Sequence, residues 1–256
     1  LQDDGSGSMQ QVGAVTNYAD NERIFSARFI ADRGYVVTFR QIDPLFSFDL
    51  SDPANPQLAG ELKIPGFSTY MHPIGDNHLL TIGQDGDDAG LSGKIAVKLF
   101  DVSDLASPML VDSYVPDLGN GYSWSSANWD HHAFTYYEPL NMLAFPVSSY
   151  NYNTAESSAG IVALDVNLQT GLSFAGRVDH EDLSQQANCS GEEYCHDNYY
   201  SWLARPTRSV FMTSDEKNFL FTLSNTGIKT VETTDFSTTA GSLLLPDAGE
   251  YFQVYY

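Results

Sequence analysis

Asp130, His131 and His132 are three consecutive residues whose types could support metal binding or acid–base chemistry. Imidazole nitrogens bind divalent metals, and a carboxylate can orient a histidine ring through a hydrogen bond. We expect these residues to lie on a strand, where adjacent side chains point to opposite faces. The two histidines would then share one ion only if the strand were bulged. Two interpretations stay open: one histidine lines a channel with Asp130 behind it, or a buried His–Asp hydrogen bond ties a loop to a strand.

Asp85, Asp87 and Asp88 offer a second kind of chemistry, in the glycine-containing segment 84–90. Calcium takes several carboxylate and carbonyl oxygens from a flexible loop, and three aspartates in four positions supply them. The alternating spacing and terminal glutamate of an EF-hand are missing. The segment predicts either a calcium site, the one cofactor that the sequence suggests, or an acidic loop that water solvates.

Tyrosine and tryptophan residues gather in three inserted segments, 116–129, 150–152 and 179–205. These side chains give a large contact area with little loss of side-chain entropy, and their polar edges tolerate water. Either they form a ligand face for a glycan or a protein, or they pack the long loops onto the scaffold. The residues assigned to the ligand face are Tyr122, Trp124, Trp129, Tyr199, Tyr200 and Trp202.

The composition disfavours several classes of partner. The chain has 33 acidic and 12 basic residues and a net charge of −21, which disfavours nucleic acid and anionic membranes. No apolar run reaches the 18 residues or more of a membrane span. A nucleophilic serine in a Gly-x-Ser-x-Gly turn is also missing, so the sequence makes no positive case for an enzyme.

Cys189 and Cys195 are the two cysteines of the chain, and both stand in a polar segment. Their spacing does not match a Cys-x-x-Cys redox or zinc motif. We interpret them as a local disulfide that closes this loop, with two free thiols as the alternative. A disulfide indicates an oxidising compartment and therefore export.

A repeated strand-end signature shows which elements must position these residues. Phe48–Asp52 returns as Phe100–Asp104, and more loosely as Leu164–Asn167 and Val231–Asp235, at intervals of about 50 to 70 residues. Short strands with this period predict a β-propeller, whose four-stranded blades bury their faces against neighbouring blades. The sequence therefore predicts an all-β chain of about four blades.

The blades can be placed by aligning the repeats. Residues 1–8 read as a linker, and the propeller runs over residues 9–256. Strands that stand outside complete blades suggest a larger propeller, with the remaining blades supplied by the same precursor or by another chain. The blades are expected at about 23–66, 67–117, 128–180 and 206–247, with partial strands at 9–16 and 250–256.

Three segments carry a resemblance to a known family: Ser26–Phe46, Glu61–Tyr70 and Trp129–Phe134. They resemble bacterial and archaeal secreted proteins with a C-terminal β-propeller domain. The Asp-Val-Ser-Asp turn is also similar to the repeat of surface-layer-type propellers. The likeness covers residues 9–180 well and implies the fold and export. It implies no activity and no catalytic residues.

These observations together favour an exported propeller that acts as a binding or assembly module, at the cell surface or outside it, with the periplasm as another possible location. One alternative is an enzyme with a metal- or histidine-centred site at Asp130, His131 and His132. The other is a structural component of an extracellular layer or filament, in which the edges at Gln11–Val15 and Tyr251–Tyr256 pair with another chain.

Overall fold

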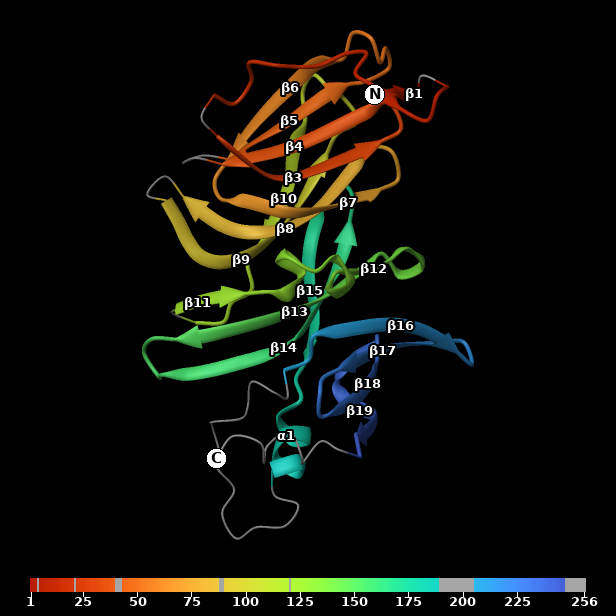
Figure 1. Cartoon of the computed structure of the whole chain (residues 1–256). Coiled ribbons are helices and arrows are strands. Elements are labelled where there is room, and N and C mark those ends of the chain that lie inside the picture. The colour runs from red at the N-terminus through yellow and green to blue at the C-terminus, as the bar shows by residue number, and fades with distance from the viewer. Residues whose placement is uncertain are drawn as a thin grey trace. The chain divides into compact units, whose positions relative to one another are not determined.

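Apart from a two-stranded ribbon near the N-terminus, the described strands of the computed structural model form four antiparallel sheets, each built from strands that follow one another in sequence (Figure 1). The structure describes residues 1–3, 5–20, 22–39, 43–87, 90–119, 121–188 and 205–246. The chain divides into two compact units, residues 1–116 with 168–171 and residues 117–167 with 172–256. Each unit contains two sheets. The predicted all-β fold of four-stranded blades is confirmed.

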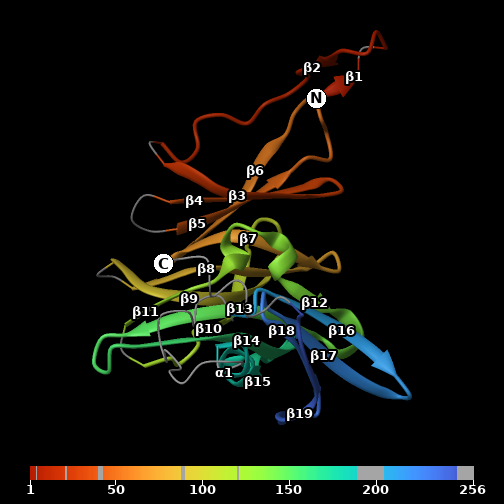
Figure 2. The same ribbon diagram turned by 60° about the horizontal axis from the view of Figure 1, so that its bottom comes forward.

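The first unit contains sheets one and two. Gly66 makes the turn between them with a φ of 83°, in the left-handed region that favours glycine. A ribbon of β1 (Gln2–Asp3) and β2 (Met9–Gln10) lies beyond sheet one in Figure 2. Sheet one is β3 (Arg23–Ile30), β4 (Arg33–Phe39), β5 (Asp43–Asp49) and β6 (Gln57–Ile64). Sheet two is β7 (Phe67–Ile74), β8 (His78–Asp87), β9 (Gly90–Asp101) and β10 (Met109–Tyr114).

The second unit contains sheets three and four, together with short helices. Sheet three is β11 (Gly121–Trp124), β13 (Met142–Asn151), β14 (Glu156–Asn167) and β15 (Gly171–Val178), and β12 (Thr135–Tyr137) also pairs with β13. Sheet four is β16 (Arg208–Ser214), β17 (Lys217–Leu223), β18 (Gly227–Glu232) and β19 (Asp235–Leu244). The helices are η1 (Ser126–Asn128), η2 (His131–Ala133), η3 (Glu138–Leu140) and α1 (Glu181–Asn188).

Each unit has a core in which its two sheets pack face to face. Alternation along a strand sends every second side chain to this core: Tyr35 and Val37 of β4 join it, while Val36 packs with Phe46 and Phe48 in a separate cluster. In the first unit the core is Tyr35, Val37, Leu45, Ile64, Met71, Leu79, Phe100 and Val102. In the second unit it is Met142, Ala144, Ile161, Ala163, Val178, Phe211, Leu220 and Val231.

The strand-end signature has a physical basis in turns made by aspartate. The Asp49 carboxylate accepts the backbone N–H of Ser51 at 2.9 Å, and Asp101 accepts that of Ser103 at 2.9 Å. The last aspartate of the signature caps the next bend, since Asp104 accepts the N–H of Ala106 at 2.9 Å. The repeat thus encodes the connection from the third strand of a blade to its outer strand.

A β-bulge stands at the same place in three of the sheets. In sheet one, Ser47 pairs with Gly60 and Phe48 with Leu58, so Ala59 is the extra residue of the outer strand. The equivalent extra residue is Val111 in sheet two and Ala240 in sheet four. A bulge increases the local twist of a strand, which suits the outer edge of a twisted blade.

Three local expectations differ from the structure. The segment 84–93 is no open loop, because β8 and β9 extend through it as a hairpin, with Asp87 paired with Gly90. In the segment Gln11–Val15 no strand forms, and the nearby β2 ends at Gln10. Segment 179–205 begins with the helix α1, which is too short to show a 3.6-residue pattern in the sequence.

Candidate functional site

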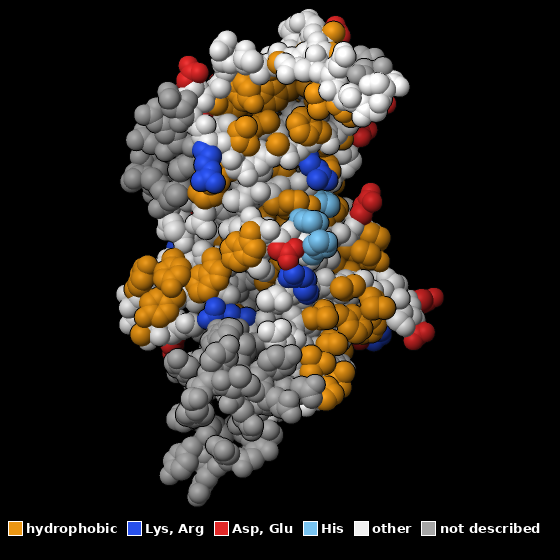
Figure 3. Space-filling view, viewed as in Figure 1, with side chains coloured by type: hydrophobic (Ala, Val, Ile, Leu, Met, Phe, Trp, Pro, Cys, Tyr) orange, Lys and Arg blue, Asp and Glu red, His pale blue; other side chains and the backbone are white. Residues whose placement is uncertain are grey.

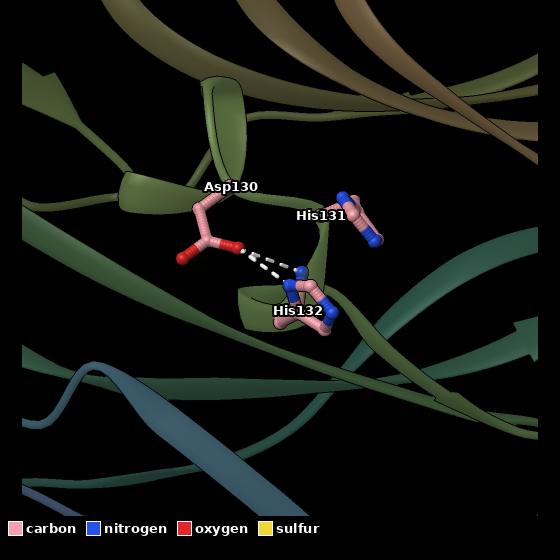
Figure 4. A group of neighbouring side chains, drawn as sticks. All are labelled: Asp130, His131 and His132. Atoms are coloured by element: carbon pink, nitrogen blue, oxygen red, sulfur yellow. Dashed lines mark hydrogen bonds and ion pairs between the residues drawn. The ribbon is translucent and has the colours of Figure 1, made fainter.

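Asp130 and the two histidines after it lie in a helical turn and not on a strand. Asp130 is the N-cap of η2, and its Oδ1 accepts the backbone N–H of His132 at 3.0 Å. The same oxygen lies 3.1 Å from Nδ1 of His132 (Figure 4). The expectation that the histidines point to opposite faces is therefore wrong, because the chain turns at this point. Their ring centroids are 4.0 Å apart.

The charges around this group are set by Arg208 at the start of β16. Its guanidinium donates to Oδ2 of Asp130 from 78 residues further along the chain. The N–H of His132, and also the charge of Arg208, hold the pKa of Asp130 below its usual range. The His132 side chain is 72% exposed and that of Asp130 is 30% exposed. The His–Asp hydrogen bond therefore exists, but it is at the surface and not in the core.

An aromatic cluster of Tyr122, Trp124, Tyr150 and Tyr152 lies on sheet three. Tyr122 and Trp124 share one face of β11, and Tyr122 stands opposite Tyr150 in the register with β13. The ring centroid of Tyr122 lies 5.3 Å from that of Trp124, 5.8 Å from Tyr150 and 5.9 Å from Tyr152. Strand pairing thus brings residues of two inserted segments into one surface.

The aromatic cluster is exposed and carries one cation. Tyr122 is 42% and Tyr152 65% exposed, and Figure 3 shows hydrophobic side chains gathered over β11 and the β13–β14 hairpin. The guanidinium carbon of Arg205 lies 5.4 Å from the ring centroid of Trp124. Burial lowers the pKa of Arg205. The cluster therefore offers π faces together with a cationic hydrogen-bond donor.

A buried histidine network ties α1 to sheet four. His180 is 2% exposed, with Nδ1 2.8 Å from the Ser224 hydroxyl and Nε2 2.9 Å from that of Thr222. Burial lowers the pKa of His180 to about 4. The Ser224 oxygen also accepts the N–H of Gly227 at 3.2 Å, so this hydroxyl is part of a turn. Lys229 adds an ion pair of 2.7 Å to Asp182 of α1.

Comparison with family models identifies the fold. A β-propeller domain model matches residues 1–236. The chain belongs to this β-propeller family. An uncharacterized protein of Methanocaldococcus jannaschii is 43% identical over 141 residues, which is 55% of this chain and 21% of that protein. An uncharacterized protein of Archaeoglobus fulgidus is 39% identical over 144 residues, or 56% of this chain and 22% of that protein. The matched stretch spans about a fifth of these relatives.

Solved structures give a distant likeness to this propeller. A periplasmic gluconolactonase of Pseudomonas aeruginosa aligns with a TM-score of 0.47 and 12% identity, over 88% of this chain and 55% of that one. A nidogen/laminin complex aligns with a TM-score of 0.37 and 8% identity, over 94% of this chain and 72% of that one. Among the residues that the structure describes, no helix has the length and hydropathy needed to cross a membrane.

The remaining residues that the sequence predicted as site residues belong neither to the aromatic cluster nor to the η2 turn, or lie outside the described residues. Trp129 follows η1, is 72% exposed, and is not a member of the aromatic cluster. Asp85 and Asp87 belong to the strand β8 and not to a loop. Six further predicted positions lie outside the described residues: Asp88, Cys189, Cys195, Tyr199, Tyr200 and Trp202.

Arg205 and Arg208 are the site residues that sequence reasoning missed. Both stand far along the chain from the groups that they contact, so no local spacing connects them. A signal was nevertheless present, because only 12 of 256 residues are basic. Two of these few basic residues, Arg205 and Arg208, stand within four positions of each other and follow a segment rich in tyrosine. In so acidic a chain, such a pair indicates that the arginines contact specific groups.

Proposed function

We propose that this β-propeller is a non-catalytic binding module and that the aromatic cluster is its ligand face. The observation that carries the proposal is the set of four rings with neighbouring centroids 5.3 to 5.9 Å apart, two of them strongly exposed. Three of the rings, those of Tyr122, Trp124 and Tyr150, stand on paired strands. Rings held in this way lose little entropy on binding, so their contact area contributes efficiently to affinity.

The chemistry of the cluster suits a glycan or a protein segment. Flat π faces stack on sugar rings or on proline and aliphatic side chains, while the tyrosine hydroxyls and Arg205 supply hydrogen bonds. A net charge of −21 disfavours strongly anionic partners away from Arg205. The proposal includes action at the cell surface or outside the cell, which is supported by the resemblance to secreted proteins.

The test is binding to a panel of neutral and acidic oligosaccharides and of peptides, followed by calorimetry for each ligand found. Trp124→Ala and Tyr152→Ala should each weaken binding tenfold or more, while near-ultraviolet circular dichroism stays native. Tyr152 is the safer variant for folding, since its side chain is 65% exposed. Trp129→Ala is the matched control, because it removes an exposed tryptophan outside the cluster. Ligands that bind both cluster variants as tightly as the unaltered protein would disprove the proposal.

A further inference from the structure

The η2 turn brings three potential metal ligands together that a strand would separate. One ligand atom from each of Asp130, His131 and His132 can be chosen so that all three lie within 4.8 Å of one another. That spacing is close enough for small adjustments of side-chain torsions to place them around one ion. The group is also accessible, since both histidines are exposed.

The contact between Asp130 and His132 prepares one histidine for coordination. A neutral ring that donates from Nδ1 to the carboxylate keeps its lone pair on Nε2, the atom that then binds a metal. A carboxylate behind a ligand histidine fixes the orientation of the ring and raises its basicity. Because the N–H of His132 holds the same carboxylate oxygen, the orienting group is itself held in place.

We propose that His131 and His132 bind a divalent transition ion such as Zn²⁺ or Cu²⁺, with Asp130 as the residue that positions His132. Imidazole nitrogens suit these borderline ions. Calcium needs six to eight oxygen ligands, which this group does not provide. Water or a further ligand would complete the coordination.

The positive charge of Arg208 opposes the binding of a metal cation at this site. Its guanidinium pairs with Oδ2 of Asp130, so a positive charge stands beside the place where the ion would bind. The net charge of −21 acts in the opposite direction and raises the concentration of cations near the protein. Removing the Arg208 charge should therefore strengthen metal binding, an effect that chance binding to exposed histidines elsewhere would not show.

The experiment is calorimetric titration of the whole chain with Zn²⁺ and with Cu²⁺, with Ca²⁺ as the comparison ion. We expect one strong site for each transition ion and none of comparable affinity for Ca²⁺. His131→Gln and His132→Gln should each weaken that site tenfold or more. His78→Gln is the matched control, a histidine on β8 in the first unit. The electron paramagnetic resonance spectrum of bound Cu²⁺ should show coupling to two imidazole nitrogens in the unaltered protein and to one in either site variant.

Two further variants separate a built site from a chance pair of histidines. Asp130→Asn still offers an oxygen to the N–H of His132 but loses the charge, and it should weaken binding about 10- to 100-fold. Arg208→Gln should tighten binding severalfold. Each variant is first checked for an unchanged thermal melt without metal. The proposal would be overturned if the metal affinity were unchanged in His131→Gln and His132→Gln. It would also be overturned if neither Asp130→Asn nor Arg208→Gln changed that affinity.

Discussion

Among the described residues, the first unit consists mainly of sheets one and two, while the second unit also carries the aromatic cluster, the η2 turn and the His180 network. The strands within sheets one and two are joined mostly by short turns, including those made by Asp49 and Asp101. In the second unit the same blade plan is interrupted by the segments before β12 and before β16, which contain η1, η2 and α1, and by η3 between β12 and β13. The difference shows that the repeat encodes the fold and the insertions encode the candidate sites.

The two cores differ as well. The core of the first unit holds Tyr35 and Phe100, whereas that of the second uses Ala144 and Ala163 on its central strands. Small residues let sheets approach closely, and Gly176 of β15 illustrates this, because a Cβ there would overlap Cγ of Phe236. The central strands of the first core therefore carry larger buried side chains than those of sheet three in the second core.

Truncating the large core residue should have the largest effect. Phe100→Ala is expected to lower the free energy of unfolding by about 3–5 kcal/mol, because it removes a buried ring and leaves a cavity. Val231→Ala, at the equivalent repeat position in sheet four, should cost about 2 kcal/mol. Urea unfolding of both variants makes the comparison. Equal losses would show that the two cores do not differ in the way described.

Acidification should affect the second unit through His180. Its pKa is about 4 in the folded protein and about 6.5 when unfolded, so the unfolded chain binds a proton first as the pH falls. Stability is thus complete above pH 6.5 and declines toward pH 4, by about 3 kcal/mol for this group. Urea unfolding from pH 7.5 to 4.5 measures the slope. His180→Gln should flatten it, and an unchanged slope in that variant would contradict the prediction.

Adding one methyl group should test the close fit in the second unit. Gly176→Ala places a carbon against Phe236 and should cost about 1–3 kcal/mol through overpacking. Phe236→Leu in the same chain should recover part of the loss by making room, which a double-mutant cycle detects. Additive losses in the double variant would rule out contact between the two positions as the cause.

The smallest effect is expected at the turns of the first unit. Asp101→Ala removes the acceptor for the N–H of Ser103, and the melting temperature should fall by about 2 °C at pH 7. The hydrogen bonds from Ser103 lower the pKa of Asp101, so this contribution is lost only when the pH falls below the ordinary aspartate value. Asp101→Asn, which keeps an acceptor oxygen, should recover most of the difference. If the melting temperature were equally low for both variants, the loss of stability would come from the negative charge of Asp101 and not from the hydrogen bond.

Much of the fold could be predicted because its signals are local. The turn made by Asp101 and Ser103 involves residues two positions apart, and the strand β4 is marked by a continuous run of β-branched and aromatic residues from Tyr35 to Phe39. The candidate site could be predicted only in part. A three-residue helix such as η2 has no periodicity to detect, and the contact between Arg208 and Asp130 joins positions 78 residues apart. At segment 84–93 pairing between β8 and β9 outweighed the polar composition that favoured a loop.

The bulges at Ala59, Val111 and Ala240 bear on how the chain arose. Alternation of inward and outward side chains does not require an extra residue there, and an insertion at any neighbouring position would twist the strand just as well. An irregularity repeated at one position, next to one turn, is what tandem duplication of a single ancestral blade would leave.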